Sequence, residues 1–172
     1  SRATPAQQRP CRRQPQTFPT YRTSTKQKTR VLFVCGQNSA RSQMAEALLD
    51  HLAPEDYEAH SAGIEPAPIN PLAVAAMAER GIDISQKRTK LVAEAVAELA
   101  AQGGQFDVVV TVCSKAAGVC PFVPGVRVTE RWSFDDPGTV TGSPQEQLAK
   151  VRAVRDDIEA TLRQWIAARK NA

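Results

Sequence analysis

The chain has 172 residues, 42% of them hydrophobic, which is enough for one domain with a buried core. No apolar run approaches the roughly 20 residues of a membrane-spanning helix, so we expect no membrane contact. The formal net charge is +4, but the charge is unevenly distributed along the chain. The first 30 residues hold eight of the 22 Lys and Arg and none of the 18 Asp and Glu. The remaining residues are therefore mildly acidic, which argues against a nucleic acid as partner.

Residues 1–29 are rich in Pro, Gln, Thr, Ser and Arg and show no hydrophobic periodicity. Such a segment buries too little apolar surface to offset the entropy of ordering, so we predict a disordered basic tail. An Arg-rich segment without acidic residues also resembles an organelle transit peptide, although its prolines and glutamines are unfavourable for the amphipathic helix of such a peptide. Cys11 lies in this tail, and we expect it to take no part in the chemistry.

The first predicted strand, Val31–Val34, leads into the segment around which the sequence is organised. Cys35 opens a loop and Arg41 closes it; a helix then follows, with apolar residues at helical spacing up to Leu52. A strand that leads through a short loop into a helix start directs backbone N–H groups at one place, and the helix dipole favours negative charge there. This arrangement predicts an oxyanion site with a thiol beneath it.

Six further elements are predicted after this helix. They are a strand at Tyr57–Gly63, a helix at Pro71–Arg80, a helix at Leu91–Leu99, a strand at Phe106–Val112, a shorter strand at Gly125–Thr129 and a helix from Ser143 to Trp165. The run before Cys113 is almost continuously β-branched, as in a strand covered on both faces, and the last helix begins with a capping box. Alternating strands and helices predict an α/β fold, a parallel four-stranded sheet flanked by helices, as a single domain over residues 30–172.

Each residue type in the loop has a chemical reason to be there. Backbone N–H groups would stabilise the thiolate of Cys35 and make it nucleophilic. Arg41 offers a planar fork for two oxygens of a tetrahedral anion, Ser42 can donate its hydroxyl to the cysteine sulfur, and Asn38 tolerates the left-handed backbone of a tight loop. We assign substrate binding to Gly36, Gln37, Asn38, Ser39, Ala40, Arg41 and Ser42. A core cysteine near an unrelated surface arginine is the alternative interpretation.

The segment from Val31 to Ser42 resembles the phosphate-binding loop of the low-molecular-weight tyrosine phosphatases and of the thioredoxin-coupled arsenate reductases that share their scaffold. The next residues, up to Ala47, resemble the reductases. One departure is Gly36-Gln37 before Asn38, where the family more often has glycine directly before the asparagine. The resemblance covers residues 30 to about 168, and it implies a phosphatase-like fold and an enzyme that reduces arsenate.

Two further cysteines, Cys113 and Cys120, follow the buried strand at the sheet edge where a parallel sheet would also place Cys35. Alone, two cysteines at this spacing are more often core residues than redox partners. The reductases have their second and third catalytic cysteines at this spacing. The resemblance therefore implies that Cys113 forms a disulfide with Cys35 as arsenite leaves, and that Cys120 then forms a disulfide with Cys113, which thioredoxin or a similar thiol carrier reduces.

Expulsion of an oxygen from arsenate requires a general acid, and two aspartates precede Pro137. The aspartate directly before proline matches the family's acid, so we assign Asp136, with Asp135 as second choice; such pairs are also common in turns.

The alternative function is a tyrosine phosphatase with the same loop and acid. Those phosphatases usually have an aromatic residue where Gly138 stands, and they do not need the two further cysteines. A non-catalytic oxyanion sensor is a third reading, disfavoured because no catalytic residue is missing.

The four cysteines form neither a CxxC pair nor a secreted-type framework, so we expect no zinc site and a reducing, cytoplasmic location. We also expect a monomer that needs no metal and no cofactor beyond the external dithiol. Some reductases of the family bind potassium beside the loop through Asn, Glu, Ser and Asp side chains. Asn38, Glu46 and Ser61 match the first three, and the place of the aspartate falls on Lys90. We expect the Lys90 ammonium to replace the cation and support the loop; a solvated lysine is the alternative.

Overall fold

The computed structural model describes residues 26–114, 123 and 125–172, with the backbone alone at 113 and 114. They contain a four-stranded parallel sheet in the order β2-β1-β3-β4. The strands are β1 (Thr29–Cys35), β2 (Tyr57–Gly63), β3 (Val108–Ser114) and β4 (Glu130–Phe134). The helices are α1 (Arg41–Leu52), α2 (Pro71–Ala78), α3 (Val92–Ala101), the short 3-10 helix η2 (Pro137–Thr139) and α4 (Pro144–Lys170). The predicted α/β class and parallel four-stranded sheet are confirmed.

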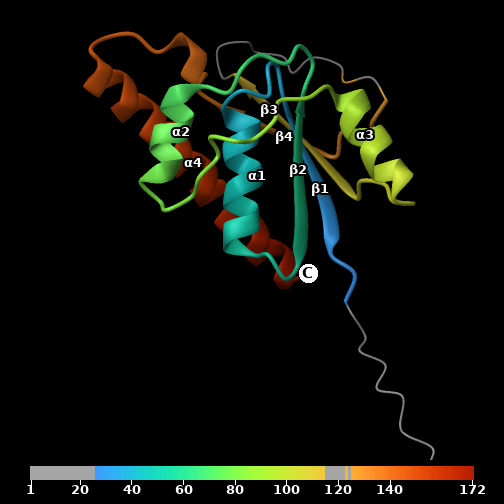
Figure 1. Ribbon diagram of the computed structural model, residues 1–172. Helices are drawn as coiled ribbons and strands as arrows, with labels where there is room; N and C mark the ends of the chain where they lie inside the picture. Colours follow the sequence, from blue (N-terminus) through green and yellow to red (C-terminus); the bar gives the residue numbers. More distant parts are fainter. Residues whose placement is uncertain (1–25, 115–122, 124) are drawn as a thin grey trace, which may run out of the picture.

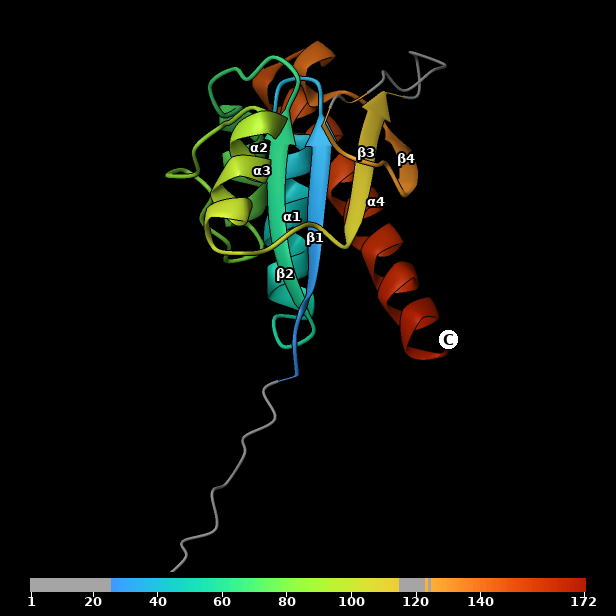
Figure 2. The same ribbon diagram turned by 90° about the vertical axis from the view of Figure 1, so that its right-hand side faces the viewer.

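Helices cover both faces of the sheet, with α1, α2 and α4 on one face and α3 on the other (Figure 1, Figure 2). The side chains of β1 alternate between the two layers. Val31 and Phe33 belong to the core formed with α1 and α4, whereas Leu32 and Val34 belong to the core formed with α3. Since both faces of β1 are buried, an apolar residue is favourable at each of these positions, and this explains the continuous apolar run.

The expected strand at Gly125–Thr129 is wrong, because the fourth strand is Glu130–Phe134. Its register pairs Val110 with Glu130 and continues to the end of β3. The apolar residues Val126 and Val128, which suggested a strand, instead pack from a loop against the core beneath α3. The actual strand lies at a sheet edge and alternates exposed and covered positions, so its charged residues concealed it from a search for apolar runs.

An aromatic cluster joins β4 to α4. The ring of Trp132 lies 5.9 Å from that of Phe33 and 6.1 Å from that of Trp165, which also packs on Tyr57 at 5.1 Å. The two carboxylate oxygens of Glu130 accept the indole N–H groups of Trp132 and Trp165, at 3.1 and 3.0 Å. Both half-buried indoles therefore have their polar atom satisfied, and the edge strand is held against the long C-terminal helix.

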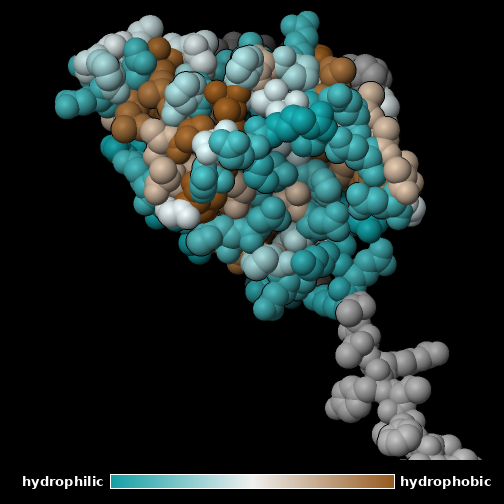
Figure 3. Space-filling model, in the orientation of Figure 1, coloured by the Kyte–Doolittle hydropathy of each residue, from teal (hydrophilic) through white to brown (hydrophobic). Residues whose placement is uncertain are grey.

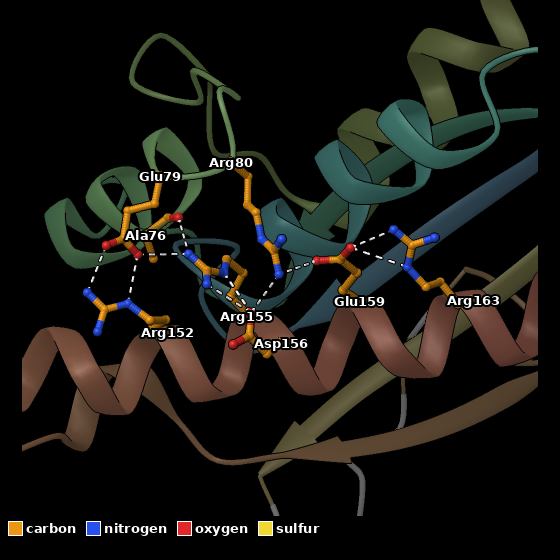
Figure 4. Close-up of polar contacts among 8 residues, drawn as sticks. All are labelled: Ala76, Glu79, Arg80, Arg152, Arg155, Asp156, Glu159 and Arg163. Carbon is orange, nitrogen blue, oxygen red and sulfur yellow. Dashed lines mark hydrogen bonds and ion pairs between the residues drawn. The ribbon is translucent and has the colours of Figure 1, made fainter.

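A network of charged side chains connects the end of α2 to α4 (Figure 4). Arg155, which is buried, donates from Nη1 to the carbonyl oxygen of Ala76 at 2.7 Å and to Glu79 at 2.8 Å. Arg152 donates two hydrogen bonds to the same carboxylate, at 2.9 and 2.7 Å. The two hydrogen bonds from Arg152, and then the one from Arg155, lower the pKa of Glu79 from 4.5 to about 2. The network fixes the position of α2 on α4.

We expect this carboxylate to make stability depend on pH. Because the pKa of Glu79 is lower in the folded chain than in the unfolded chain, its contribution is complete above pH 4.5 and is lost as the pH falls towards 2. In thermal unfolding between these pH values, the Tm curves of wild type and Glu79→Gln should therefore differ at the upper end and converge at the lower end. Glu55→Gln, at another exposed carboxylate, is the control. Parallel curves for wild type and Glu79→Gln would contradict this assignment.

Most of the predicted tail, including Cys11, lies outside the described residues. The described residues begin slightly before the expected boundary of the tail: β1 begins at Thr29, and Lys26 forms an ion pair with Asp56 at 3.1 Å. In the orientation of Figure 1, hydrophilic residues cover most of the lower surface and hydrophobic ones gather in the upper part, around α2 (Figure 3). Among the described helices, none combines the length and apolarity needed to cross a membrane.

Candidate active site

Cys35 is the last residue of β1 and lies buried at the carboxyl end of the sheet. Its Sγ lies 2.9 Å from the hydroxyl oxygen of Ser42 and 3.2 Å from the backbone nitrogen of Asn38, which donates to it. The expected contact between the serine hydroxyl and the sulfur is therefore present. The backbone N–H of Asn38 therefore points at the sulfur, and the Ser42 hydroxyl lies within hydrogen-bond distance of it.

The loop after Cys35 turns through Asn38, whose φ is 53°. It is the one non-glycine residue with positive φ in the part of the chain that the structure describes, which confirms the left-handed conformation expected at this asparagine. Gln37 therefore needs no glycine-like backbone, and the departure from the family pattern fits the loop. The end of β2 passes so close that a Cβ on Gly63 would lie 2.8 Å from the Asn38 nitrogen, so a side chain there would displace the loop.

Three carbonyl groups of the loop face away from the sulfur, because they accept hydrogen bonds from N–H groups of the segment 64–70 at 2.8 to 3.0 Å. They belong to Gly36, Gln37 and Ser39. In a planar trans peptide the N–H points opposite to the C=O, so the N–H groups of the next residues face the interior of the loop. The N–H of Asn38, which donates to Cys35, has this orientation. The same geometry directs the N–H groups of Gln37 and Ala40 into the interior of the loop.

Arg41 and Asp136 complete the site. Arg41 is the first residue of α1 and is 8% exposed, and its Nη2 lies 3.7 Å from a carboxylate oxygen of Asp136. Its Nη1 is buried and has no hydrogen-bond partner among the described residues, so a donor is free for an oxyanion. The other carboxylate oxygen of Asp136 accepts the N–H of Gly138 at 2.8 Å. The structure therefore places Asp136 at the arginine, and Asp135 is an exposed neighbour.

Glu46 and Ser61 contact each other beside the loop as expected, but the ammonium group next to them comes from a different lysine. The buried carboxylate of Glu46 accepts the hydroxyl of Ser61 at 2.8 Å. The ammonium nearest to it belongs to Lys87, at 3.7 Å, rather than to Lys90 as expected. Lys90 supports the loop through its backbone, since its N–H donates to Asn38 Oδ1 at 3.0 Å and its carbonyl accepts the N–H of Gly63 at 2.8 Å.

The physical reason for this correction is the path of the segment that leads into α3. A bridge between Gly63 and Leu91 holds Lys90 at the end of β2, and the preceding residues then bring Lys87 over Glu46. Both lysines stand in one charged run, so no local pattern distinguishes them. The sequence reasoning also missed Gln43, which is wholly buried in the first turn of α1 and donates to Asn38 Oδ1 at 3.2 Å. The only signal was a polar residue next to the apolar stripe of this helix.

The backbone places Cys113 at the same sheet edge as Cys35. Val34 pairs with Thr111, and Cys113 is two residues further along β3, opposite Ser133 of β4. The expected position of Cys113 is confirmed at the level of the backbone, while its side chain lies outside the described structure. Cys120 also lies outside the described residues, so the predicted relay stays a prediction.

Known proteins resemble this chain in sequence and in structure. The model of the family described as low molecular weight phosphotyrosine protein phosphatase matches residues 30–172. An arsenate reductase of Halalkalibacterium halodurans is 41% identical over 128 residues, which cover 74% of this chain and 88% of that protein. A solved structure of an arsenate reductase in the phosphate binding state has a TM-score of 0.63 and 30% identity, covering 81% of this chain and 98% of that one. A thioredoxin-dependent arsenate reductase of Corynebacterium glutamicum has a TM-score of 0.57 and 29% identity over 86% of this chain and 65% of that one. The chain belongs to the low molecular weight phosphotyrosine protein phosphatase family.

Proposed function

We propose that this protein is an arsenate reductase that converts arsenate to arsenite with electrons from an external dithiol. The observation that carries the proposal is that the buried, N–H-bonded thiol of Cys35 and the strand end bearing Cys113 lie at one edge of the sheet. Relatives named arsenate reductase, at 41% and 38% identity over most of the chain, support the same activity. The oxyanion site alone would serve phosphate or arsenate equally well, because both are tetrahedral anions.

In the first step, the Cys35 thiolate attacks arsenic(V). A sulfur–arsenic bond forms and an arsenic–oxygen bond breaks, and Asp136 gives a proton so that the oxygen leaves as water. Arg41 holds the remaining oxygens from its free Nη1, together with the inward N–H groups of the loop. The 3.7 Å contact between Arg41 and Asp136 keeps the acid next to the bound anion. Arsenic keeps its oxidation state in this step.

The reduction follows when the Cys113 thiolate attacks the sulfur of Cys35. A disulfide forms between them, the sulfur–arsenic bond breaks, and arsenic takes the electron pair and leaves as arsenite. Cys120 then attacks Cys113 and releases Cys35 as a thiolate. The resulting disulfide between Cys113 and Cys120 is reduced by thioredoxin or a similar thiol carrier, and a reducing cytoplasm is the location that we propose for this cycle. We further propose that the enzyme works as a monomer. The thioredoxin-dependent reductase among the structural neighbours supports this choice of reductant.

Two assays on the same protein test the proposal. Arsenite formation is followed through NADPH consumption with thioredoxin and thioredoxin reductase, and hydrolysis of p-nitrophenyl phosphate is measured in parallel. We expect sustained NADPH oxidation that requires arsenate and yields one arsenite for each NADPH. Efficient hydrolysis of the phosphate ester without arsenate-dependent NADPH oxidation would overturn the proposal and favour a tyrosine phosphatase.

The residues beside the loop do not fit a potassium ion. Asn38 Oδ1 already accepts from Gln43 Nε2 and from the N–H of Lys90, and the free oxygen of Glu46 faces the Lys87 ammonium at 3.7 Å. A cation there would have to displace two donors and a like charge. We therefore propose that Lys87 supplies the positive charge beside the loop and that no metal or resident cofactor takes part.

We expect the Tm of the wild-type protein to be the same in potassium and sodium salts at equal ionic strength. Lys87→Met leaves the buried Glu46 without a counter-charge, so it should lower the Tm by roughly 2–6 °C in both salts. Lys90→Met is the matched control, because Lys90 contacts the loop through its backbone. A wild-type Tm that rises with potassium alone would show that a cation site persists and that Lys87 does not replace it.

A further inference from the structure

Gln43 is a buried polar residue that the catalytic steps do not use. Its side chain is 0% exposed, and its Nε2 donates both to Asn38 Oδ1, at 3.2 Å, and to the carbonyl oxygen of Arg88, at 3.3 Å. Its Oε1 is buried without a hydrogen-bond partner among the described residues. Burial of an unpaired amide oxygen is unfavourable, so a methionine of similar shape would pack at lower cost. What Gln43 contributes there is its pair of donated hydrogen bonds.

These hydrogen bonds give a direction to the chain of polar contacts that ends at the nucleophile. Asn38 Oδ1 accepts from Gln43 and from the backbone of Lys90, so the opposite end of the amide, Nδ2, faces Ser42 Oγ and donates to it at 2.9 Å. The hydroxyl oxygen of Ser42 is thus an acceptor on this side. Its single hydrogen is left for Cys35 Sγ, at 2.9 Å.

A flipped Asn38 amide would reverse this direction. Nδ2 would then face two N–H donors, and Oδ1 would face Ser42 and attract its hydrogen away from the sulfur. Gln43 provides one of the two donors that oppose the flip, and Lys90 provides the other. Without Gln43, one backbone N–H alone would hold the orientation, and the segment at Arg88 would lose its side-chain tie to α1.

We propose that Gln43 is a positioning residue, which locks the Asn38 amide so that Ser42 donates its hydrogen to the sulfur of Cys35. This role rests on the proposed function only in that Cys35 is the nucleophile. It requires neither arsenate nor a particular reductant. It also explains how the segment before α3, which contains Arg88 and Lys90, is connected to the reacting thiol through three side chains.

The test measures the rate at which iodoacetamide alkylates Cys35 as a function of pH, by mass spectrometry of the peptide that contains it. In Gln43→Met, the pH of half-maximal rate should rise by roughly 0.5–1 unit, the effect of losing one hydrogen bond that favours the thiolate. Gln43→Leu should shift it as far, because a leucine has no hydrogen to donate to Asn38. Gln147→Met is the control, since it removes an exposed amide that donates to Gly142.

The Ser42→Ala background separates positioning from packing. If Gln43 acts through Asn38 and Ser42, adding Gln43→Met to Ser42→Ala should produce no further shift of the midpoint. Additive shifts, or a fall in Tm in Gln43→Met and Gln43→Leu with the alkylation midpoint unchanged, would overturn the proposal. Because alkylation needs no arsenate, a midpoint shift in a protein that fails the arsenite assay would refute the proposed function and leave the role of Gln43 standing.

Discussion

Cys35→Ser should abolish both arsenite formation and hydrolysis of phosphate esters, with a loss of at least about a thousand-fold. The N–H of Asn38 donates to this sulfur and the Ser42 hydroxyl lies 2.9 Å from it, and a thiol is a far better nucleophile here than a serine hydroxyl, which ionises much less readily. A serine oxygen also cannot form the disulfide that delivers electrons to arsenic. Coupled NADPH oxidation and p-nitrophenyl phosphate hydrolysis measure the two losses.

Cys11→Ser is the control for this substitution, because Cys11 is expected to take no part in the chemistry. It should retain full activity in both assays. Serine is close to cysteine in size, so we expect it to fit the buried position beside Ser42. A Tm close to that of the wild type would show that the loss of activity is not caused by misfolding. Turnover of Cys35→Ser above about one per cent of wild type would remove Cys35 as the nucleophile.

Substitution of the second or the third cysteine of the relay should also have a large effect on arsenite release. Cys120→Ser should release about one arsenite per enzyme molecule and then stop, because the disulfide between Cys35 and Cys113 forms but is not passed on. Cys113→Ser should release none, since no second thiol attacks the Cys35 adduct. Arsenite released in a single turnover, together with mass spectrometry of the digested, alkylated protein, distinguishes the two variants.

The trapped species provides the internal check on this order. Cys120→Ser incubated with arsenate should yield a disulfide-linked peptide pair that contains Cys35 and Cys113, and dithiothreitol should release it. Sustained thioredoxin-driven turnover by Cys120→Ser would exclude Cys120 from the mechanism. A full equivalent of arsenite from Cys113→Ser would exclude Cys113 as the second nucleophile.

The features that the sequence predicts correctly are those that depend on interactions between neighbouring residues. The strand before Cys35, the helix after Arg41 and the capped start of α4 were predicted, because side-chain periodicity and capping act within a few residues. The positive φ of Asn38 follows from the tolerance of asparagine for the left-handed region. The contact between Ser42 and Cys35 closes within one short loop, so the spacing alone indicated it.

Contacts between distant segments determine which of several similar residues reaches the site. Asp136 rather than Asp135 lies at Arg41, and Lys87 rather than Lys90 reaches Glu46, because the paths of distant segments set these contacts. The same holds for β4, whose partner on β3 lies about twenty residues earlier and overrides the weak apolar pattern of its own residues. Such contacts depend on distances in space between segments far apart in the chain, and neither periodicity nor residue type records those distances.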